Sequence, residues 1–249
     1  RLPAEYAVWM GAIKDACHFQ ATYGVDRVRY VDEMRALVGE LDGPIFVIKG
    51  ANTDSSKNLF DCLPVADGLP PAATVDDSGL LHSVLAGCRV VKSAAEIELM
   101  RFSSYAASRA HVEVMRTAQP GLSEFQLEST FLFHLAFHFG IRLAAYTPIC
   151  ACGPNAATLH YGHAGAPNER ILEATDMALI DMGGEYRCYA SDITCSFPVS
   201  GAFDARQRII YSGVLEAQLC IFDQLRPGVM WVDMHRIAWR ETLRALCAT

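Results

Sequence analysis

Residues 179–201 read LIDMGGEYRCYASDITCSFPVSG, and this stretch predicts two neighbouring β-strands that each carry one aspartate. Asp181 ends an apolar run, and Asp192 lies in a second run, residues 189–197, in which small or apolar residues alternate with polar ones. The pair Gly183–Gly184 lies between the runs, where a tight turn needs residues that tolerate positive φ. We therefore expect a β-hairpin or two adjacent strands.

The two aspartates predict either a metal site or ordinary turn residues. Two carboxylates in a dry, apolar setting do not both stay ionised without a counter-charge, and one or two divalent cations supply it most simply. An aspartate beside a Gly-Gly pair is, however, often a turn-former or a solvated edge residue. Asp192 weakens that alternative because it is expected inside a strand, where aspartate is disfavoured. Spacing alone leaves both interpretations open.

Composition excludes several classes of protein. The chain has 249 residues, 51% of them hydrophobic and 20% charged, which allows a sizeable core in one large domain or two modest ones. A net charge of −7 and the absence of a basic stripe argue against a nucleic-acid surface. No apolar run approaches the roughly 18 residues that a membrane span needs. The first residue is Arg rather than Met and no signal peptide follows, so we expect a processed, cloned or truncated start.

The nine cysteines do not form a recognisable metal or disulfide pattern. Cys150 and Cys152 are two residues apart, would face the same side of a strand, and lack the spacing of a zinc knuckle. We expect the cysteines to be small buried hydrophobic residues in a reducing compartment, which favours a cytoplasmic location.

The chain is expected to contain two domains, residues 1–88 and 89–249. In the first, apolar positions in residues 26–41 predict a helix, and residues 44–50 predict a short buried strand that ends at Gly50. These elements are too few for a complete sheet. We expect residues 1–88 to be the C-terminal part of an α/β domain and its linker.

Two capping-box patterns begin helices in the second domain. Ser93 with Glu96, and Ser123 with Gln126, place an N-cap residue three positions before a side chain that can return the hydrogen bond. Gly140 is expected to close the second helix. Residues 146–152 and 177–197 supply strands, so the domain is expected to be α+β.

The same layout then begins again. Asp204 and Gln207 predict the start of a third long helix, and Asp233 is expected to cap a fourth. The segments TAQPGLSEFQLE and QLRPGVMWVDMHRIA correspond, which indicates an internal duplication with a period near 110 residues. The second copy reaches Thr249 where its strands would begin. We expect the catalytic domain to be incomplete, because a sheet from one copy would expose an edge and a face.

Several motifs resemble the prolidases (Xaa-Pro dipeptidases) of the pita-bread metallopeptidase family. They are HYGHAGAPN at 160–168, the pair LIDMGGEY and SDITCSFP within 179–198, and RPGVMWVDMHRIA at 226–238. RLPAEYAVWMGAIK and ANTD near the start also match. The resemblance implies a creatinase/aminopeptidase-like (pita-bread) catalytic domain, built from two similar halves and preceded here by part of an α/β domain.

The resemblance also implies a metal centre and a reaction. The family holds two Mn²⁺ ions, or Co²⁺ or Zn²⁺, through two Asp, one His and two Glu. Asp181 and Asp192 occupy the Asp positions, and the other three ligands belong to the second half of the fold, which this chain does not include. A hydroxide bridging the two ions cleaves dipeptides that end in proline.

Four further residues receive roles from the resemblance. His160 corresponds to a catalytic histidine that contacts the substrate or its tetrahedral intermediate. Tyr146 and Ile149 correspond to residues lining the substrate pocket, and Thr194 to a residue that orients the bridging aspartate. Apart from the resemblance, His160 and His163 are ordinary loop histidines, and the role of His163 stays open.

The sequence is compatible with three alternative functions for this chain. The first is a piece of a metal-dependent Xaa-Pro dipeptidase, with Xaa-Pro dipeptides as substrates and a homodimer as the expected assembly. By itself this piece is expected to be inactive, because it lacks the His/Glu/Glu ligands. The second is a non-catalytic pita-bread module that binds peptides or proteins, although such modules typically lose the aspartates. The third is a related activity, such as that of aminopeptidase P or creatine hydrolysis.

Overall fold

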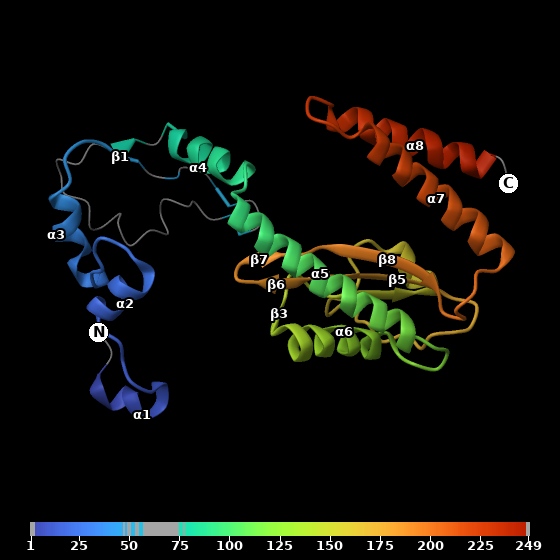
Figure 1. Cartoon of the computed structure of the whole chain (residues 1–249), viewed down its shortest axis with the longest axis horizontal. Coiled ribbons are helices and arrows are strands. Elements are labelled where there is room, and N and C mark those ends of the chain that lie inside the picture. The colour runs from blue at the N-terminus through green and yellow to red at the C-terminus, as the bar shows by residue number, and fades with distance from the viewer. Residues whose placement is uncertain are drawn as a thin grey trace. The chain divides into compact units, whose positions relative to one another are not determined.

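The fold is described from a computed structural model of the chain (Figure 1). The structure describes residues 3–46, 48, 51–52, 55–56, 75–76 and 78–247. The chain divides into two compact units, Arg1–Lys92 and Ser93–Thr249. Each unit is described by itself.

In its described residues, the first unit combines short helices with a pair of strands. Its elements are η1 (Ala4–Tyr6), α1 (Ala7–Met10), α2 (Ala16–Tyr23), η2 (Val31–Glu33), α3 (Met34–Gly39), β1 (Ile45–Phe46), β2 (Val75–Asp76) and α4 (Leu80–Val90). β1 and β2 pair in parallel.

Two predictions for the first unit need correction. The helix expected over residues 26–41 is confined to η2 and α3. The strand expected over residues 44–50 is described only at β1, and Phe46 is 41% exposed, so it is not the buried strand that we expected. Beyond Phe46, the rest of the expected strand, apart from residue 48, lies outside the described residues.

Two long helices open the second unit as the capping boxes predicted. α5 (Ala94–Thr117) begins after Ser93, whose Oγ accepts a hydrogen bond from the Glu96 N–H while the Glu96 carboxylate accepts one from the Ser93 N–H. α6 (Glu124–Phe139) begins at the second capping box, in which the Ser123 N–H donates to Oε1 of Gln126 at 2.8 Å. Gly140 ends it at φ +67°, a conformation that favours glycine. Both helix starts and the Gly140 stop are confirmed.

The strands form two small antiparallel sheets. β4 (Ile149–Cys152), β5 (Met177–Met182) and β8 (Ile193–Pro198) lie in the order β4-β5-β8, and β3 (Leu143–Ala144), β6 (Gly184–Tyr186) and β7 (Tyr189–Ala190) lie in the order β3-β6-β7. A 3₁₀ turn, η3 (Gly153–Ala157), follows β4. The two strands predicted around the Asp pair are therefore β5 and β8, which are neighbours. The run 189–197 is not one strand, however: it is divided into β7 and β8, and Asp192 lies just before β8 instead of inside a strand as expected.

The turn expected at Gly183–Gly184 lies elsewhere. Gly184 belongs to β6, and neither glycine has a positive φ; the chain reverses at Arg187 (φ 49°) and Cys188 (φ 69°), between β6 and β7. Gly183 is needed for a different reason, because a Cβ there would lie 1.7 Å from the carbonyl oxygen of Ser191. The glycine pair permits a close backbone approach and does not make the turn.

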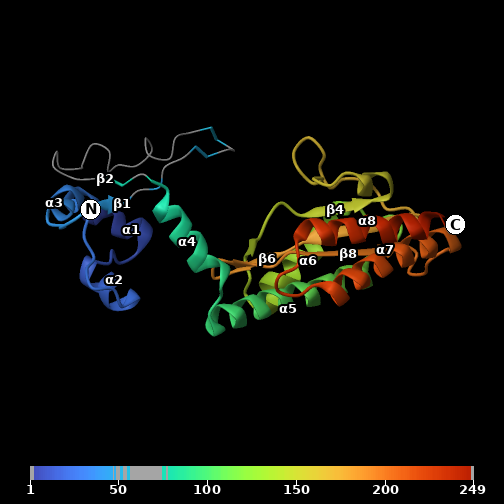
Figure 2. The ribbon, with the colours of Figure 1, turned by 90° about the horizontal axis from the view of Figure 1, so that it is seen from above.

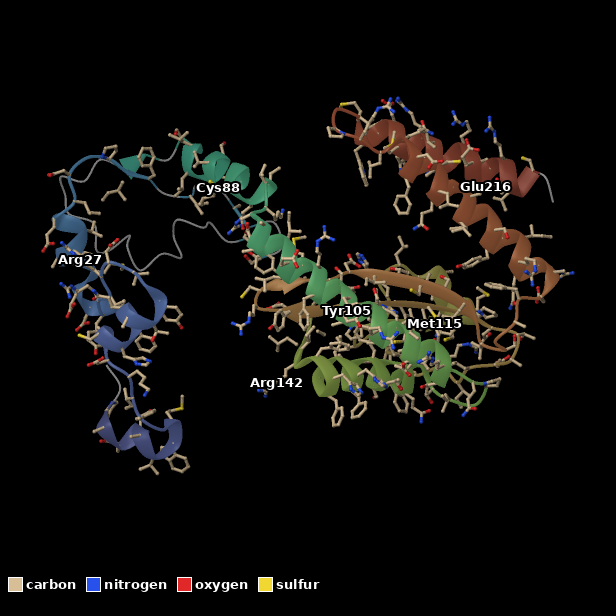
Figure 3. All side chains as sticks on the ribbon, viewed as in Figure 1. Arg27, Cys88, Tyr105, Met115, Arg142 and Glu216 are labelled. Atoms are coloured by element: carbon tan, nitrogen blue, oxygen red, sulfur yellow. The ribbon has the colours of Figure 1, made fainter. Side chains whose placement is uncertain are left out.

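One hydrophobic core joins α5 and α6 to one face of the sheet. Its fully buried side chains include Ala106, Ala110, Leu127, Phe131 and Ile180. The opposite side of α5 is exposed, as Tyr105 and Met115 show in Figure 3. The two helices therefore cover one face of β4-β5-β8. The other face, here called the open face, is covered only in part, where Ile149, Ala151 and Tyr161 form a smaller buried cluster.

The last two helices, α7 (Ala205–Gln224) and α8 (Trp231–Cys247), lie side by side (Figures 1 and 2). Asp204 and Gln207 form the predicted capping box of α7. α8 begins at Trp231, so Asp233 lies in its first turn and is not the cap that we expected. Gly213 on α7 packs against Ala245 on α8, where a Cβ would come within 2.4 Å of the alanine Cβ. The two helix pairs agree with the predicted duplication.

The cysteines only partly follow their prediction. Cys150 and Cys152 are buried on β4, as expected, whereas Cys17, Cys88 and Cys188 are exposed. Among the helices of the described residues, none combines the length and the apolar character that crossing a bilayer requires.

Candidate active site

Asp181 lies on the open face of the sheet because of strand alternation. Along β5, the buried residues Ala178, Ile180 and Met182 point toward α5 and α6, and Asp181 belongs to the other, partly exposed set. Asp181 pairs with Thr194 on β8, and Asp192 lies two residues before Thr194. The period of two therefore puts both carboxylates on the same side.

The hydroxyl of Tyr146 joins the two carboxylates. It donates a hydrogen bond to Oδ1 of Asp181 and lies 3.0 Å from Oδ1 of Asp192, which it reaches from the segment between β3 and β4. Burial, followed by these two hydrogen bonds, raises the pKa of Tyr146 well above its usual value, so the phenol keeps its proton. Asp181 and Asp192 therefore converge on a single point.

That point lies in a hollow of about 390 Å³ on the open face. The hollow is lined by Tyr146, Thr147, Ile149, His160, Tyr161, His163, Asp181 and Asp192. No lysine or arginine is among these described lining residues. The site therefore combines two carboxylates, two imidazoles and two phenols around a polar opening with one apolar wall.

Every residue that the sequence nominated lies in or beside this hollow. Ile149 is 7% exposed and pairs directly with Asp181 across β4 and β5, while His160 is exposed at the rim. Thr194 is opposite Asp181 on β8, but among the described residues its hydroxyl forms no hydrogen bond with either carboxylate. His163 accepts a hydrogen bond from the Gly165 N–H through Nδ1, at 3.0 Å.

Helix α5 fixes the back of the strands that carry the aspartates. His111 Nε2 lies 3.1 Å from the carbonyl oxygen of Met182, and Ser103 Oγ donates to the carbonyl of Gly184 at 2.9 Å. Both side chains are buried. Burial lowers the pKa of His111, so the ring is neutral and donates to Met182. These bonds hold β5 and β6 at the position where Asp181 points outward.

A buried carboxylate fixes the other wall of the hollow. Glu124, at the start of α6, is 0% exposed and accepts hydrogen bonds from the Cys152 N–H at 2.7 Å and the Arg170 N–H at 3.1 Å. The hydroxyl of Tyr161 lies 2.8 Å from its Oε2, and Asn155 Nδ2 donates to Oε1 at 3.2 Å. Burial and the bond to Glu124 raise the pKa of Tyr161 to about 12. Glu124 therefore ties β4 to the loop that carries His160.

The donor set suits a hard divalent cation but is incomplete. Carboxylate oxygens are the ligands that Mg²⁺, Ca²⁺ and Mn²⁺ prefer, and those of Asp181 and Asp192 face one hollow without a cationic side chain. Catalytic sites usually offer at least three protein ligands to a metal. Within the described residues, no group of three or more His, Cys, Asp or Glu side chains could hold an ion. The two aspartates thus fit part of a metal centre.

Two features of the site were not predicted from the sequence. The first is the direct bond from Tyr146 to the aspartates, since Tyr146 was expected only to line the pocket. The second is Glu124. From the sequence it is an acidic residue in the first turn of a helix, which is a common position and does not indicate its hydrogen-bond partners. Only the packing of α6 against β4 shows that it is buried.

Comparisons with known proteins identify the family. The sequence pattern described as Metallopeptidase family M24 matches residues 98–245. A human Xaa-Pro dipeptidase is 43% identical over 99% of this chain and 49% of its own length. A probable Xaa-Pro aminopeptidase of Talaromyces stipitatus is 32% identical over 98% of this chain and 51% of its own length.

Solved structures agree with the sequence matches. The aminopeptidase PepP of Pseudomonas aeruginosa superposes with a TM-score of 0.82 at 32% identity, over 98% of this chain and 55% of that one. These matches confirm the predicted resemblance to the Xaa-Pro dipeptidases and the α+β, pita-bread-type fold. The chain spans about half the length of the curated relatives that it matches. With its family pattern covering more than half of its residues, the chain belongs to metallopeptidase family M24.

Proposed function

We propose that this chain supplies one half of the active site of an Xaa-Pro dipeptidase, which cleaves dipeptides ending in proline. The observation that carries the proposal is the convergence of Asp181 and Asp192 on one point of a hollow. The identity of 43% with a human Xaa-Pro dipeptidase supports this substrate class. The expected assembly, a homodimer, and the expected cytoplasmic location stay predictions.

The cofactor that we propose is a pair of Mn²⁺ ions, with Co²⁺ or Zn²⁺ as substitutes, and Asp181 and Asp192 would contribute oxygen ligands. Such ions make water nucleophilic near neutral pH and stabilise negative charge in the transition state. The choice of manganese follows from the resemblance to the prolidases, and the carboxylate donors in the hollow are compatible with it. The identity of the ion is tested by metal analysis of the purified protein.

The side chains around the aspartates would bind and orient the substrate. His160, exposed at the rim, can donate a hydrogen bond to the carbonyl oxygen that gains negative charge. Ile149 presents an apolar wall that suits a proline ring, and Tyr146 holds the two carboxylates together from the side of the pocket. Thr194, opposite Asp181, is proposed to orient that aspartate when a cation is bound.

We also propose that the 249-residue chain is inactive by itself. Two divalent ions carry four positive charges, and the two carboxylates offset half of them. Among the described residues no glutamate lines the hollow, and the resemblance assigns neither His160 nor His163 as the ligand histidine. We expect weak Mn²⁺ binding and no hydrolysis.

An assay of Gly-Pro cleavage by the chain with added Mn²⁺ tests this proposal. We expect no proline release above that of the Asp192→Ala variant. Mn²⁺ titration by electron paramagnetic resonance should show weak binding that Asp181→Asn or Asp192→Asn removes. Proline release that Asp192→Ala abolishes would contradict the inactivity, and Mn²⁺ binding unaffected by both Asn variants would contradict the metal assignment.

A second candidate is an aminopeptidase P-like activity, because solved structures of similar fold, such as the proline aminopeptidase P II of Yersinia pestis, carry that name. The lower identity with the Talaromyces stipitatus protein, 32%, favours the dipeptidase. A complete protein that contains this chain should cleave Gly-Pro faster than a tripeptide with proline in the middle. The opposite preference would support the aminopeptidase, and cleavage of neither peptide would support the non-catalytic module.

A further inference from the structure

Two histidines lie one helical turn apart on α6, away from the hollow. His134 and His138 have an (i, i+4) spacing, which places neighbouring side chains on one face of a helix. Their rings stack, with centroids 5.1 Å apart and planes inclined by 17°. An ion bound by both rings would lie in the plane of each, so the two side chains must rotate out of this stack, and the (i, i+4) spacing keeps them close enough to do so.

The ring nitrogens of both residues are available. His138 is exposed and His134 is partly exposed, and within the described part of the chain neither ring forms a hydrogen bond. His163, by comparison, already binds the Gly165 N–H. The neighbours Phe133 and Phe137 stack on each other and are 54% and 72% exposed, so the pair has an apolar margin that offers no competing partner.

We propose that His134 and His138 form a surface site for one divalent transition-metal ion of the class that imidazole prefers: Zn²⁺, Ni²⁺ or Cu²⁺. Two histidines at (i, i+4) on a helix are the arrangement that HExxH motifs use to bind zinc. Among the described residues no third His, Cys, Asp or Glu completes a cluster, so water fills the remaining positions. This site is independent of the dipeptidase proposal.

The site is separate from the hollow with the aspartates. α6 packs on the face of the sheet that carries Ile180, and Asp181 points from the other face. The two sites also differ in chemistry. Affinity rises from Mn²⁺ to Ni²⁺ and Cu²⁺ at nitrogen ligands, whereas carboxylates suit Mn²⁺. The histidine pair should therefore bind Ni²⁺ much better than Mn²⁺.

Isothermal titration of the 249-residue chain with NiCl₂ tests the proposal. We expect one Ni²⁺ per chain. His138→Ala should lower the affinity more than tenfold. Loss of a residue that only orients a metal ligand already costs roughly 10–100-fold in affinity, and His138 is proposed to bind the ion directly. His138 is the residue to replace because it is exposed, and far-UV circular dichroism checks that the helix content is unchanged. With Cu²⁺, electron paramagnetic resonance should report two nitrogen ligands in the wild type.

Three controls separate this site from other histidines and from the hollow. His235→Ala removes an exposed histidine on α8 that contacts Trp239 instead of a second histidine, and Ni²⁺ affinity should not change. Asp192→Asn and His160→Ala should also leave it unchanged. The proposal is wrong if the wild type does not bind Ni²⁺, if His138→Ala binds it as well as the wild type, or if Asp192→Asn abolishes binding.

Discussion

At the scale of single residues, the close approach of two backbones makes Gly183 irreplaceable. Any Cβ at this position would lie 1.7 Å from the carbonyl oxygen of Ser191, which is backbone and cannot rotate away. Gly183 itself accepts a hydrogen bond from the Ala145 N–H through its carbonyl. The residue thus lies where two segments that flank the aspartates meet.

Gly183→Ala should therefore destabilise the chain strongly. The added methyl group forces β5 away from Ser191, and overpacking of this kind costs roughly 1–3 kcal/mol or more. Urea unfolding followed by circular dichroism measures the loss. Gly87→Ala, in α4 with no atom near its new Cβ, is the matched control and should be neutral or slightly stabilising. Equal stability of Gly183→Ala and the wild type would show that the approach is not this close.

Burial of His111 predicts a pH dependence of stability. Burial lowers the pKa of His111 below 6.5, against a smaller opposing effect of its bond to the Met182 carbonyl. Above about pH 6.5 the ring is neutral in both the folded and the unfolded chain. Below that pH the unfolded chain takes up a proton that the folded chain resists, so the free energy of unfolding falls as the pH falls.

We expect a lower urea midpoint at about pH 5.5 than at about pH 7.5, with His111 as one cause. His111→Phe removes the titrating ring, so its midpoint should change less over the same interval. The variant also loses the bond to Met182 and should be less stable at both pH values. If the variant and the wild type lose stability equally, His111 does not contribute to the pH dependence.

At the scale of elements, helix starts could be predicted from the sequence better than turns. The capping boxes at Ser93, Ser123 and Asp204 are local patterns, and each gives the first residue of a helix. The hairpin turn could not be found in this way, because Arg187 and Cys188 adopt positive φ without a glycine to indicate it. Tertiary pairing of β6 with β7 imposes that turn.

The cap of α5 should contribute measurably to stability. Ser93→Ala removes the side-chain acceptor for the Glu96 N–H, which typically costs about 1 kcal/mol. Ser108→Ala, also on α5, is the matched control because the Ser108 hydroxyl only bonds back to the Ser104 carbonyl. It should be neutral or slightly stabilising, since alanine has the higher helix propensity. Urea unfolding of both variants checks the difference, and equal midpoints would contradict it.

At the scale of the whole molecule, the site is assembled from segments far apart in the sequence. Two neighbouring strands with one carboxylate each could be predicted from the sequence, but the shared side of Asp181 and Asp192 also needs the register that pairs Asp181 with Thr194. The bond from Tyr146 and the buried network of Glu124 could not, because they depend on how a loop and a helix pack against β4 and β5. The catalytic role expected for His160 came from the family resemblance, because sequence spacing alone did not predict it.

Asp181 and Asp192 together should lower the stability of the chain when no metal is bound. Two carboxylates that share one hydroxyl group repel each other, and only a cation would offset this. Asp181→Asn keeps the shape and can still accept from Tyr146 while it removes one charge. Without metal, the variant should melt roughly 2–4 °C above the wild type, which corresponds to about 1 kcal/mol for a chain of this length.

Thermal unfolding in the presence of a chelator measures this difference. Asp26→Asn, an exposed aspartate in the first unit, is the control for a general effect of net charge and should leave the midpoint unchanged. Added Mn²⁺ at millimolar concentration should raise the midpoint of the wild type, because ligands that bind the folded state stabilise it, and should not raise that of Asp181→Asn. If Asp181→Asn lowers the midpoint without metal, the two carboxylates do not repel each other and the hollow needs no cation.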